Sequence, residues 1–283
     1  MDRLKQNKIT NVIFLFLCHA AVIITLVIVV GMCGYIGAKG MFRGGKIANG
    51  FNTLYFGSSS PLSGIIGNTV VFLLLTLLLS VPLGLFSAIY LCFYAPKNNI
   101  TYVIEASIST LQALPSIIFG LFGMLLFVNV CGFGYSLLSG VLTVTLMVLP
   151  TLIYASMAAI KRVNPALLEA SMALGSTKSE AIFKVVLKDA AKGILSSVLL
   201  STGRALGETA ALLYTIGSSS EFITSLFSPS RTLSMNIYLA LNEAKGLDEV
   251  YASAFILLIS IIVINVGVHL IIKSIKGKEY GRN

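Results

Sequence analysis

The chain has 283 residues, of which 56% are hydrophobic and only 11% carry a charged side chain. A soluble domain normally has about 25% charged residues, so this composition excludes a soluble globular protein. The net charge of +9 is explained by where basic residues lie around a membrane, and it gives no reason to expect nucleic acid as a partner.

Six apolar stretches are each long enough to cross a hydrocarbon core of about 30 Å, which takes about 20 helical residues. In chain order they cover residues 11–35, 65–94, 103–130, 136–159, 194–217 and 251–273. We therefore predict an all-α integral membrane protein with six transmembrane helices. Residues 1–10 are expected to form a cytoplasmic N-terminal tail, and residues 11–283 a single transmembrane domain.

Positive charge is distributed unequally around these stretches. Most of the 20 lysines and arginines lie beside the two termini or in the loop 160–193. Because basic residues remain on the cytoplasmic side, we predict that both termini and this loop lie in the cytoplasm. The first stretch is too long for a signal peptide and lacks a cleavage site, so it is expected to stay as a helix in the cell membrane, surrounded by lipid.

The third stretch contains a proline at position 115, followed by Gly120. Proline removes one backbone donor and kinks a helix, and in a membrane the freed carbonyl needs a neighbour or water in a cavity. Pro115 is therefore a candidate pathway kink. A kink that only aids packing explains the same residues equally well.

The loop 160–193 carries the start and stop signals of two short helices. Asn164 suits an N-cap, Pro165 suits the first helical position, and Gly175 suits the left-handed residue that closes a helix. Thr177 and Glu180 have the spacing of a capping box for a second helix. These signals predict a defined structure with a sharp turn at Gly175, and by themselves they fit any cytoplasmic interaction loop.

The fifth stretch places two charges in an apolar span. Arg204 and Glu208 are four residues apart, so on one helix they share a face and can pair. A charge at the centre of a membrane helix costs about 2.5–3.5 kcal/mol, which makes ionisable residues there functional candidates. Thr209 adds a hydroxyl, and the planar fork of arginine suits phosphate-like oxyanions. These residues therefore favour a path for an anion. The alternatives are an ion pair kept for helix registration and a cation path that uses Glu208.

Other polar features point to no catalytic or metal site. The cysteines are scattered without metal-ligand spacing, and the histidines fall singly in apolar stretches. Residues 40–46 mimic a phosphate-binding loop, but Ile47 follows where a magnesium ligand is needed and no strand precedes. The mixed charges of the segment 218–250 are typical of a solvated surface, with a docking face as the alternative. The sequence thus offers no site for nucleotide hydrolysis, so any energy that its function needs must come from a partner or a gradient.

Residues 169–187 resemble the EAA loop of ABC importer permeases. The resemblance rests on Glu169, Ala170 and Ser171, on Gly175 four residues later, and on the apolar run 185–187. In that family the loop is a coupling helix that sits in a groove of the cytoplasmic ATPase, so the resemblance implies ATPase coupling by these four residues. The sequence departs from the family pattern at Lys188, where proline is usual, and at Ser171, where alanine is.

Three further motifs resemble the phosphate-import permeases of the Pst system. They are residues 149–151 (Leu-Pro-Thr), residues 114–117 (Leu-Pro-Ser-Ile) and residues 203–210 (Gly-Arg-Ala-Leu-Gly-Glu-Thr-Ala), within a similarity that covers 65–272. The run from Glu208 to Thr215 is closer to the A-type subunit. The resemblance implies the type I ABC importer permease fold, with Arg204, Glu208 and Thr209 along the substrate path.

The same resemblance implies the partners. They would be a homologous C-type permease subunit, a dimeric cytoplasmic ATPase that holds ATP and magnesium, an external phosphate-binding protein and inorganic phosphate. This chain itself would be a transport subunit without enzymatic activity or a bound cofactor. The alternatives are an importer permease for sulfate, molybdate or phosphonate, an ATP-independent secondary anion transporter, and an intramembrane enzyme.

Overall fold

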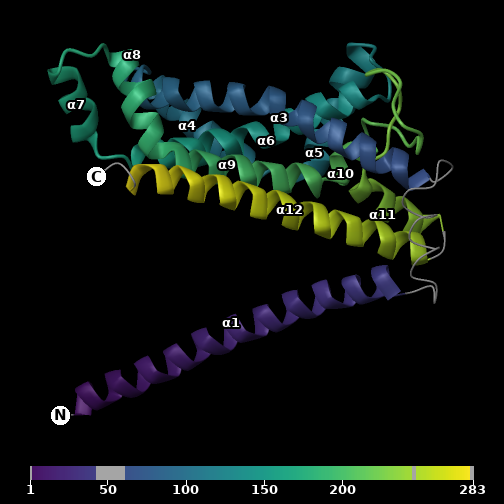
Figure 1. Ribbon diagram of the computed structural model, residues 1–283, viewed down its shortest axis with the longest axis horizontal. Helices are drawn as coiled ribbons and strands as arrows, with labels where there is room; N and C mark the ends of the chain where they lie inside the picture. The colour runs from purple at the N-terminus through teal and green to yellow at the C-terminus, as the bar shows by residue number, and fades with distance from the viewer. Residues whose placement is uncertain (1, 43–60, 244–246, 281–283) are drawn as a thin grey trace.

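The computed structural model describes residues 2–42, 61–243 and 247–280, and within these ranges every regular element is helical (Figure 1). In chain order the elements are α1 (Asp2–Phe42), α3 (Pro61–Phe93), α4 (Asn99–Gln112), α5 (Ser116–Gly123), η1 (Met124–Val130), α6 (Leu137–Lys161), α7 (Pro165–Ala173), α8 (Lys178–Ala181), η2 (Ile182–Val186), α9 (Leu187–Leu206), α10 (Ala210–Leu213), α11 (Leu233–Asn242) and α12 (Leu247–Tyr280). The two η segments are π-helical. The all-α prediction is confirmed, and the phosphate-loop mimic at 40–46 lies largely outside the described residues.

Among the described residues, four helices are long and apolar enough to cross a membrane alone. They are Phe14–Gly40, Leu62–Phe93, Leu137–Lys161 and Val250–Leu270. The pair α4 and α5–η1 would form a fifth span, although it is bent by 102°. The count of six is not confirmed, because the expected span 194–217 is interrupted where α9 ends at Leu206 and only the short α10 follows. Helix α1 already begins at Asp2, so the expected tail continues the first helix.

The proline at position 115 separates two helices instead of kinking one. Helix α4 ends at Gln112 and α5 begins at Ser116, with Pro115 itself extended at φ −59° and ψ 139°. Proline disfavours the helical conformation of the residue before it, which explains why the helix stops at this point. The prediction of a kink inside a continuous helix was therefore wrong in form, and the break turns α5 toward α6 and α10.

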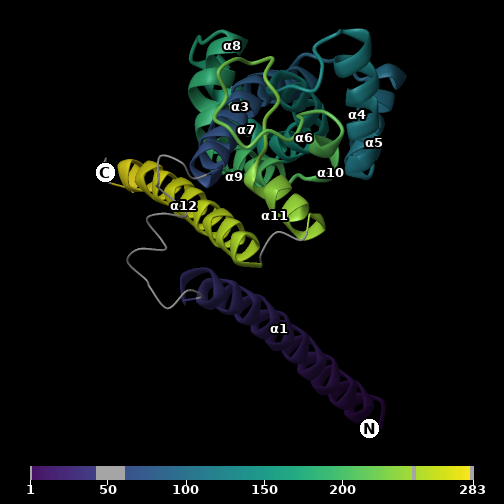
Figure 2. The ribbon, with the colours of Figure 1, turned by 90° about the vertical axis from the view of Figure 1, so that its right-hand side faces the viewer.

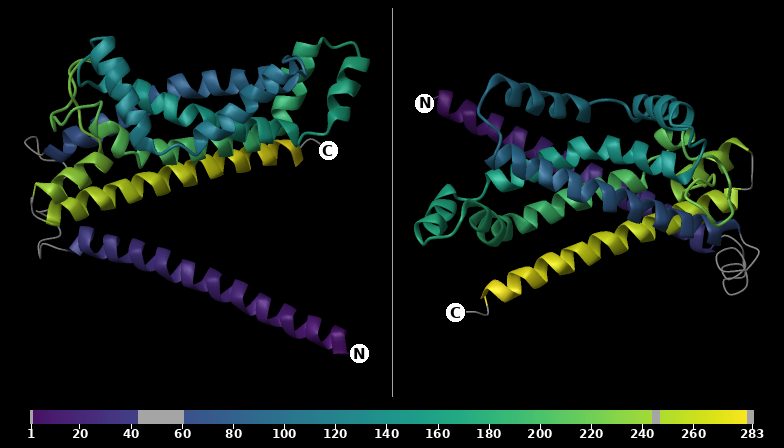
Figure 3. Two further views of the ribbon diagram at one scale, coloured as in Figure 1. Left: turned by 180° about the vertical axis from the view of Figure 1, so that it is seen from behind. Right: turned by 90° about the horizontal axis from the view of Figure 1, so that it is seen from above.

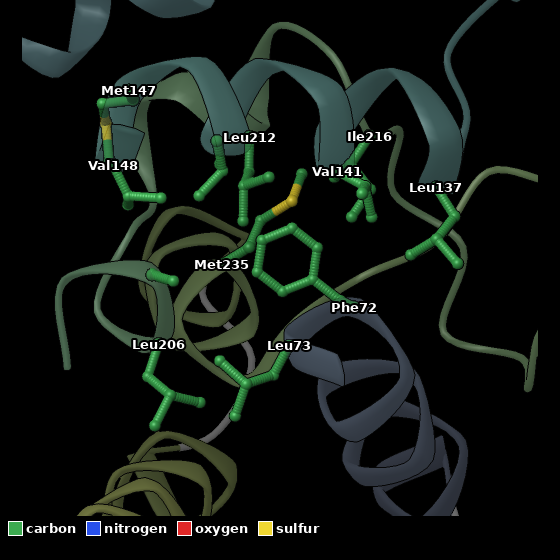
Figure 4. Packing of buried hydrophobic residues seen from close by; sticks show 12 residues of the cluster. Phe72, Leu73, Leu137, Val141, Met147, Val148, Leu206, Leu212, Ile216 and Met235 are labelled. Atoms are coloured by element: carbon green, nitrogen blue, oxygen red, sulfur yellow. The ribbon is translucent and has the colours of Figure 1, made fainter. Parts of the chain in front are cut away.

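The centre of the bundle is formed by α3, α6 and α9, and α10 and α11 pack against it. Figure 4 shows Phe72 of α3 and Met235 of α11 lying together, surrounded by Val141, Leu212 and Ile216. Phe72 is 1% exposed and Met235 is 2% exposed. This cluster fixes the short helix α10 against the long helices, and so it sets the position of the helix break between α9 and α10.

Helix α1 diverges from the rest of the molecule (Figures 1 and 3). Almost every side chain described between residues 14 and 35 is exposed, and contact with α12 is confined to the end of α1. There the rings of Tyr35 and Tyr251 meet edge to face, with centroids 6.0 Å apart. The apolar side chains of α1 are thus presented to lipid or to another subunit.

The two ends of the bundle carry different segments. Helices α7 and α8 and the C-terminal end of α12 lie at one end, whereas the loop between α10 and α11 lies at the other (Figure 1). Figure 2 views the molecule from the end that carries this loop. The loop predicted to be cytoplasmic and the C-terminal end of α12 are therefore on one side of the bundle. We call the end with α7 and α8 the coupling end, and the opposite end the far end.

The central cluster gives a stability prediction. Replacing Phe72 with Ala should lower the free energy of unfolding by about 3–5 kcal/mol, because the buried ring leaves a cavity. Phe86→Ala is the matched control, since Phe86 lies on the same helix and is 60% exposed. Thermal denaturation of the purified protein in detergent compares the two variants. Equal shifts of Tm would contradict the assignment of the core.

Candidate functional site

Arg204 lies in the last turn of α9 and is anchored to α6 through one bond. Its Nη1 donates a hydrogen bond to Oγ1 of Thr151 at 2.8 Å, and the hydroxyl of Thr151 is largely buried. The Arg204 side chain is partly exposed, and its other N–H donors have no partner among the described residues. A positively charged fork is thus held in place with donors to spare, as an oxyanion ligand requires.

Glu208 lies beyond the end of α9, in the helix break formed by residues 207–209 before α10. Its carboxylate oxygen Oε1 accepts a hydrogen bond from the backbone N–H of Ala211 at 2.9 Å, and the residue is 7% exposed. Its backbone carbonyl accepts a hydrogen bond from Oγ of Ser234 at 2.7 Å. Glu208 therefore caps the start of α10 and ties the break to α11.

The expected ion pair between Arg204 and Glu208 does not form. The i, i+4 geometry requires a continuous helix, but α9 ends at Leu206 and Gly207 follows as its C-cap. Each charged side chain has found a different partner, a threonine hydroxyl for Arg204 and a backbone N–H for Glu208. The prediction of paired charges was wrong because it assumed a continuous helix, although Gly207 between the two residues is of a type that commonly ends one.

Helix α5, which follows Pro115, packs against α10 beside this helix break. A Cβ atom at Gly120 would lie 2.7 Å from the Cα of Ala211, so only glycine allows this close approach. Ala211 is the residue whose N–H is capped by Glu208. The structure thus brings the region after Pro115 next to the segment 204–211, two motifs that lie far apart in the sequence. Thr209 is partly buried there, and its hydroxyl has no partner among the described residues.

A buried arginine in the far-end loop was missed by the sequence analysis. Arg231 is 7% exposed, with Nε donating to the carbonyl of Ser218 and Nη1 to Oδ1 of Asn236, both at 3.0 Å. Asn236 in turn donates to Oγ of Ser253 on α12. The interpretation of this loop as a solvated surface holds for the exposed Glu221 and is wrong for Arg231. No local pattern marks Arg231, because its partners come together only in the folded chain.

The coupling end has the local structure that its sequence predicts. Oδ1 of Asn164 accepts a hydrogen bond from the N–H of Ala166, and Pro165 begins α7. Gly175 has φ +92°, the left-handed conformation expected at the turn. The capping box is complete, with hydrogen bonds both from Thr177 to Glu180 and from Glu180 to Thr177.

A hydrogen bond from Lys184 and two from Thr177 lower the pKa of the Glu180 carboxyl to about 2. Any stabilisation by the ionised box is thus complete above the ordinary pKa of about 4.3, and is lost as the pH falls toward 2.

The turn between α7 and α8 presents apolar side chains to solvent. Leu174 is 90% exposed, and Leu167 and Met172 are also exposed. Glu169 and Ala170 lie on the exposed surface of α7, while Ser171 is half-buried and its hydroxyl contacts that of Ser176 at 2.8 Å. Exposed apolar side chains gathered on one short segment, as Leu167, Met172 and Leu174 are, favour a protein–protein contact. Leu174 was not among the predicted site residues, although its place just before Gly175 could have marked it.

The fold and this arrangement define a membrane subunit of a solute transporter. A family model described as "Binding-protein-dependent transport system inner membrane component" matches residues 80–277. The chain belongs to this family of ABC importer permeases.

Individual relatives agree with this membership. The chain is 32% identical over 261 residues to a probable ABC transporter permease protein, YqgI, of Bacillus subtilis, covering 84% of each chain. It is 31% identical to the phosphate permease PstC of Pasteurella multocida, over 79% of this chain and 77% of the relative. It is 34% identical to PstA 1 of Mycobacterium tuberculosis, over 68% of this chain and 63% of the relative. The predicted similarity to Pst permeases is confirmed, and relatives of both types leave A-type membership a prediction.

A solved structure supports the fold. The chain superposes with a TM-score of 0.70, at 16% identity, on a chain of a bacterial ABC transporter involved in the import of alginate. The match covers 92% of this chain and 95% of that one. At this low identity the likeness concerns the fold alone, and it confirms the importer permease architecture.

The capping role of Glu208 is testable. Glu208→Leu should lower the free energy of unfolding by about 1–3 kcal/mol, because the buried N–H of Ala211 then lacks an acceptor. Glu208→Gln keeps an acceptor oxygen and should lower it less. The measurement is thermal denaturation of the purified protein, and indistinguishable melting of the two variants would argue against the cap.

Proposed function

We propose that this chain is the transmembrane permease subunit of an ATP-driven importer of inorganic phosphate. Together with a homologous permease subunit it would form the path by which phosphate enters the cytoplasm. The observation that carries this proposal is the guanidinium of Arg204, anchored by Thr151 with its remaining donors unpartnered among the described residues. The names of the Pst relatives support phosphate as the oxyanion.

The roles of the site residues follow from their positions. Arg204 attracts the anion and binds its oxygens through the free side of the fork. Glu208 keeps the segment after α9 in place, and Thr209 offers a hydroxyl beside it. The break after Pro115 supports this segment through the contact of Gly120 with Ala211. Within the described part of the chain the Glu208 carboxylate makes no ion pair with Arg204, so the guanidinium charge remains directed to the anion.

The remaining parts of the transporter would be separate chains. We propose that a dimeric cytoplasmic ATPase, which holds ATP and magnesium, docks at the turn that carries Leu174 and Gly175. Both termini would then lie in the cytoplasm. An external phosphate-binding protein would deliver phosphate at the far end, where the loop between α10 and α11 is exposed.

Reconstituted transport tests the substrate. Proteoliposomes would contain this chain with its second permease, its ATPase and its binding protein, and the measurement is ATP-dependent uptake of radiolabelled phosphate. Uptake that resists an excess of sulfate or molybdate is expected. ATP hydrolysis without phosphate uptake, in a complex that instead imports one of the competitors, would contradict phosphate as the substrate.

In the same assay, Arg204→Met should reduce phosphate uptake about 10- to 100-fold, because hydrogen bonds to charged groups contribute about 1.5–3 kcal/mol. Arg204→Lys keeps the charge without the fork, so its phosphate uptake should lie between that of the wild type and that of Arg204→Met. Thr151→Val removes only the anchor and should cause a smaller loss. Wild-type uptake by an assembled Arg204→Met complex would refute the role of the guanidinium.

The coupling turn gives a separate prediction. Gly175→Val should weaken binding of the ATPase and uncouple transport, because a β-branched residue is strained at φ +92°. Gly175→Asn is the matched control, since asparagine tolerates the left-handed conformation. Co-purification of the ATPase with each variant is the measurement. Full retention with normal uptake in Gly175→Val would speak against coupling through this turn.

A further inference from the structure

A pocket of about 360 Å³ opens between α4 and α6 at the coupling end. Helix α4 contributes Tyr102, Glu105 and Ser109, and helix α6 contributes Tyr154 and Lys161. Neither the path residues around Arg204 nor the turn at Gly175 lines this pocket. Its chemistry is mixed, with a cation, a carboxylate and several hydroxyls around one space.

The polar groups of this pocket are only partly satisfied. Nζ of Lys161 lies 3.3 Å and 3.4 Å from the two carboxylate oxygens of Glu105. The side chains of this pair are 53% and 37% exposed. The hydroxyls of Tyr102, Ser109 and Tyr154 make no hydrogen bond within the described part of the chain. The pocket therefore offers one ammonium and three free hydroxyls to a ligand.

The pocket lies along the same face of α6 that carries Thr151, the hydrogen-bond partner of Arg204. On α6, the residues Thr151, Tyr154, Ala158 and Lys161 follow each other at intervals of three or four, so they share one face. Thr151 is the anchor of Arg204, and the other three line the pocket. At a rise of about 1.5 Å per residue, Lys161 lies about 15 Å beyond Thr151 toward the coupling end.

We propose that this pocket is an exit site for inorganic phosphate after it has passed Arg204. The inference rests on the proposed function and extends it by a second binding site. Lys161 would supply the positive charge, and the hydroxyls of Tyr102, Ser109 and Tyr154 would donate to phosphate oxygens. The ion pair does not prevent phosphate from binding Lys161, since both side chains are exposed and exposed ion pairs are weak.

Glu105 favours free phosphate over other phosphoryl groups. Inorganic phosphate retains a proton near neutral pH, so it can donate a P–OH hydrogen bond to the carboxylate. Sulfate and the phosphodiester of a lipid headgroup carry no such proton, and Glu105 repels them. The pairing of Lys161 with a carboxylate thus selects for a protonated oxyanion.

Protection of an engineered cysteine tests this site. Ala106→Cys places a thiol at the pocket wall of the complete transporter in nanodiscs, after the native Cys18, Cys33, Cys92 and Cys131 are replaced by serine. The rate of reaction with a charged thiol reagent is measured against the concentration of inorganic phosphate or sulfate. Phosphate should slow the reaction and sulfate should not.

Two lysine variants complete the design. Lys161→Met should raise the phosphate concentration needed for half-protection about tenfold or more. Lys97→Met is the matched control, because Lys97 is an exposed lysine just before α4 that does not line the pocket, and it should change nothing. Glu105→Gln should reduce the preference for phosphate over sulfate.

Distinct outcomes separate the exit site from the proposed function. Phosphate uptake by the wild type, with equal protection in Lys161→Met and the wild type, would overturn the exit site alone. Protection that follows anionic lipid in the nanodisc, instead of added phosphate, would overturn it as well and assign the pocket to a lipid headgroup. A wild-type transporter that imports no phosphate would overturn both the proposed function and the exit site.

Discussion

The interruption of the helix between α9 and α10 is the constraint on which the site depends. In a membrane, every backbone N–H and C=O needs a partner inside the protein, so a helix can stop at depth only where side chains replace its missing bonds. Glu208 supplies that replacement through its carboxylate on the N–H of Ala211, and Ser234 binds the carbonyl of Glu208. A buried charge is thus used as a structural cap, and it holds the segment that follows Arg204.

Several parts of the fold converge on this break. Helix α5 reaches it because Pro115 stops α4 and because Gly120 allows contact with Ala211. Helix α11 reaches it through Ser234, and it is tied to the far-end loop by the bonds of Arg231. The far-end loop, the break and the end of α9 are therefore joined by an unbroken set of contacts.

Sequence analysis succeeded where the determining interactions are local. The caps at Asn164 and Thr177 and the left-handed Gly175 depend on residues within three or four positions, and all three are present as predicted. It failed where partners come from distant segments. Nothing near Arg204 in the sequence indicates Thr151 as its partner, and nothing near Arg231 indicates burial. The six-span count is not confirmed for a related reason, since hydropathy alone does not detect a helix end that tertiary contacts stabilise.

The central claim is that the end of α9 lines a water-accessible anion path. The most direct test is the reactivity of Gly203→Cys in the assembled, cysteine-free transporter toward a charged, membrane-impermeant thiol reagent. Gly203 is exposed with open space around it, so the substitution fits, and Leu78→Cys on α3 is the apolar surface control. We predict rapid labelling at Gly203→Cys that phosphate slows, and little at Leu78→Cys. Labelling at Gly203→Cys as slow as at Leu78→Cys would contradict the claim.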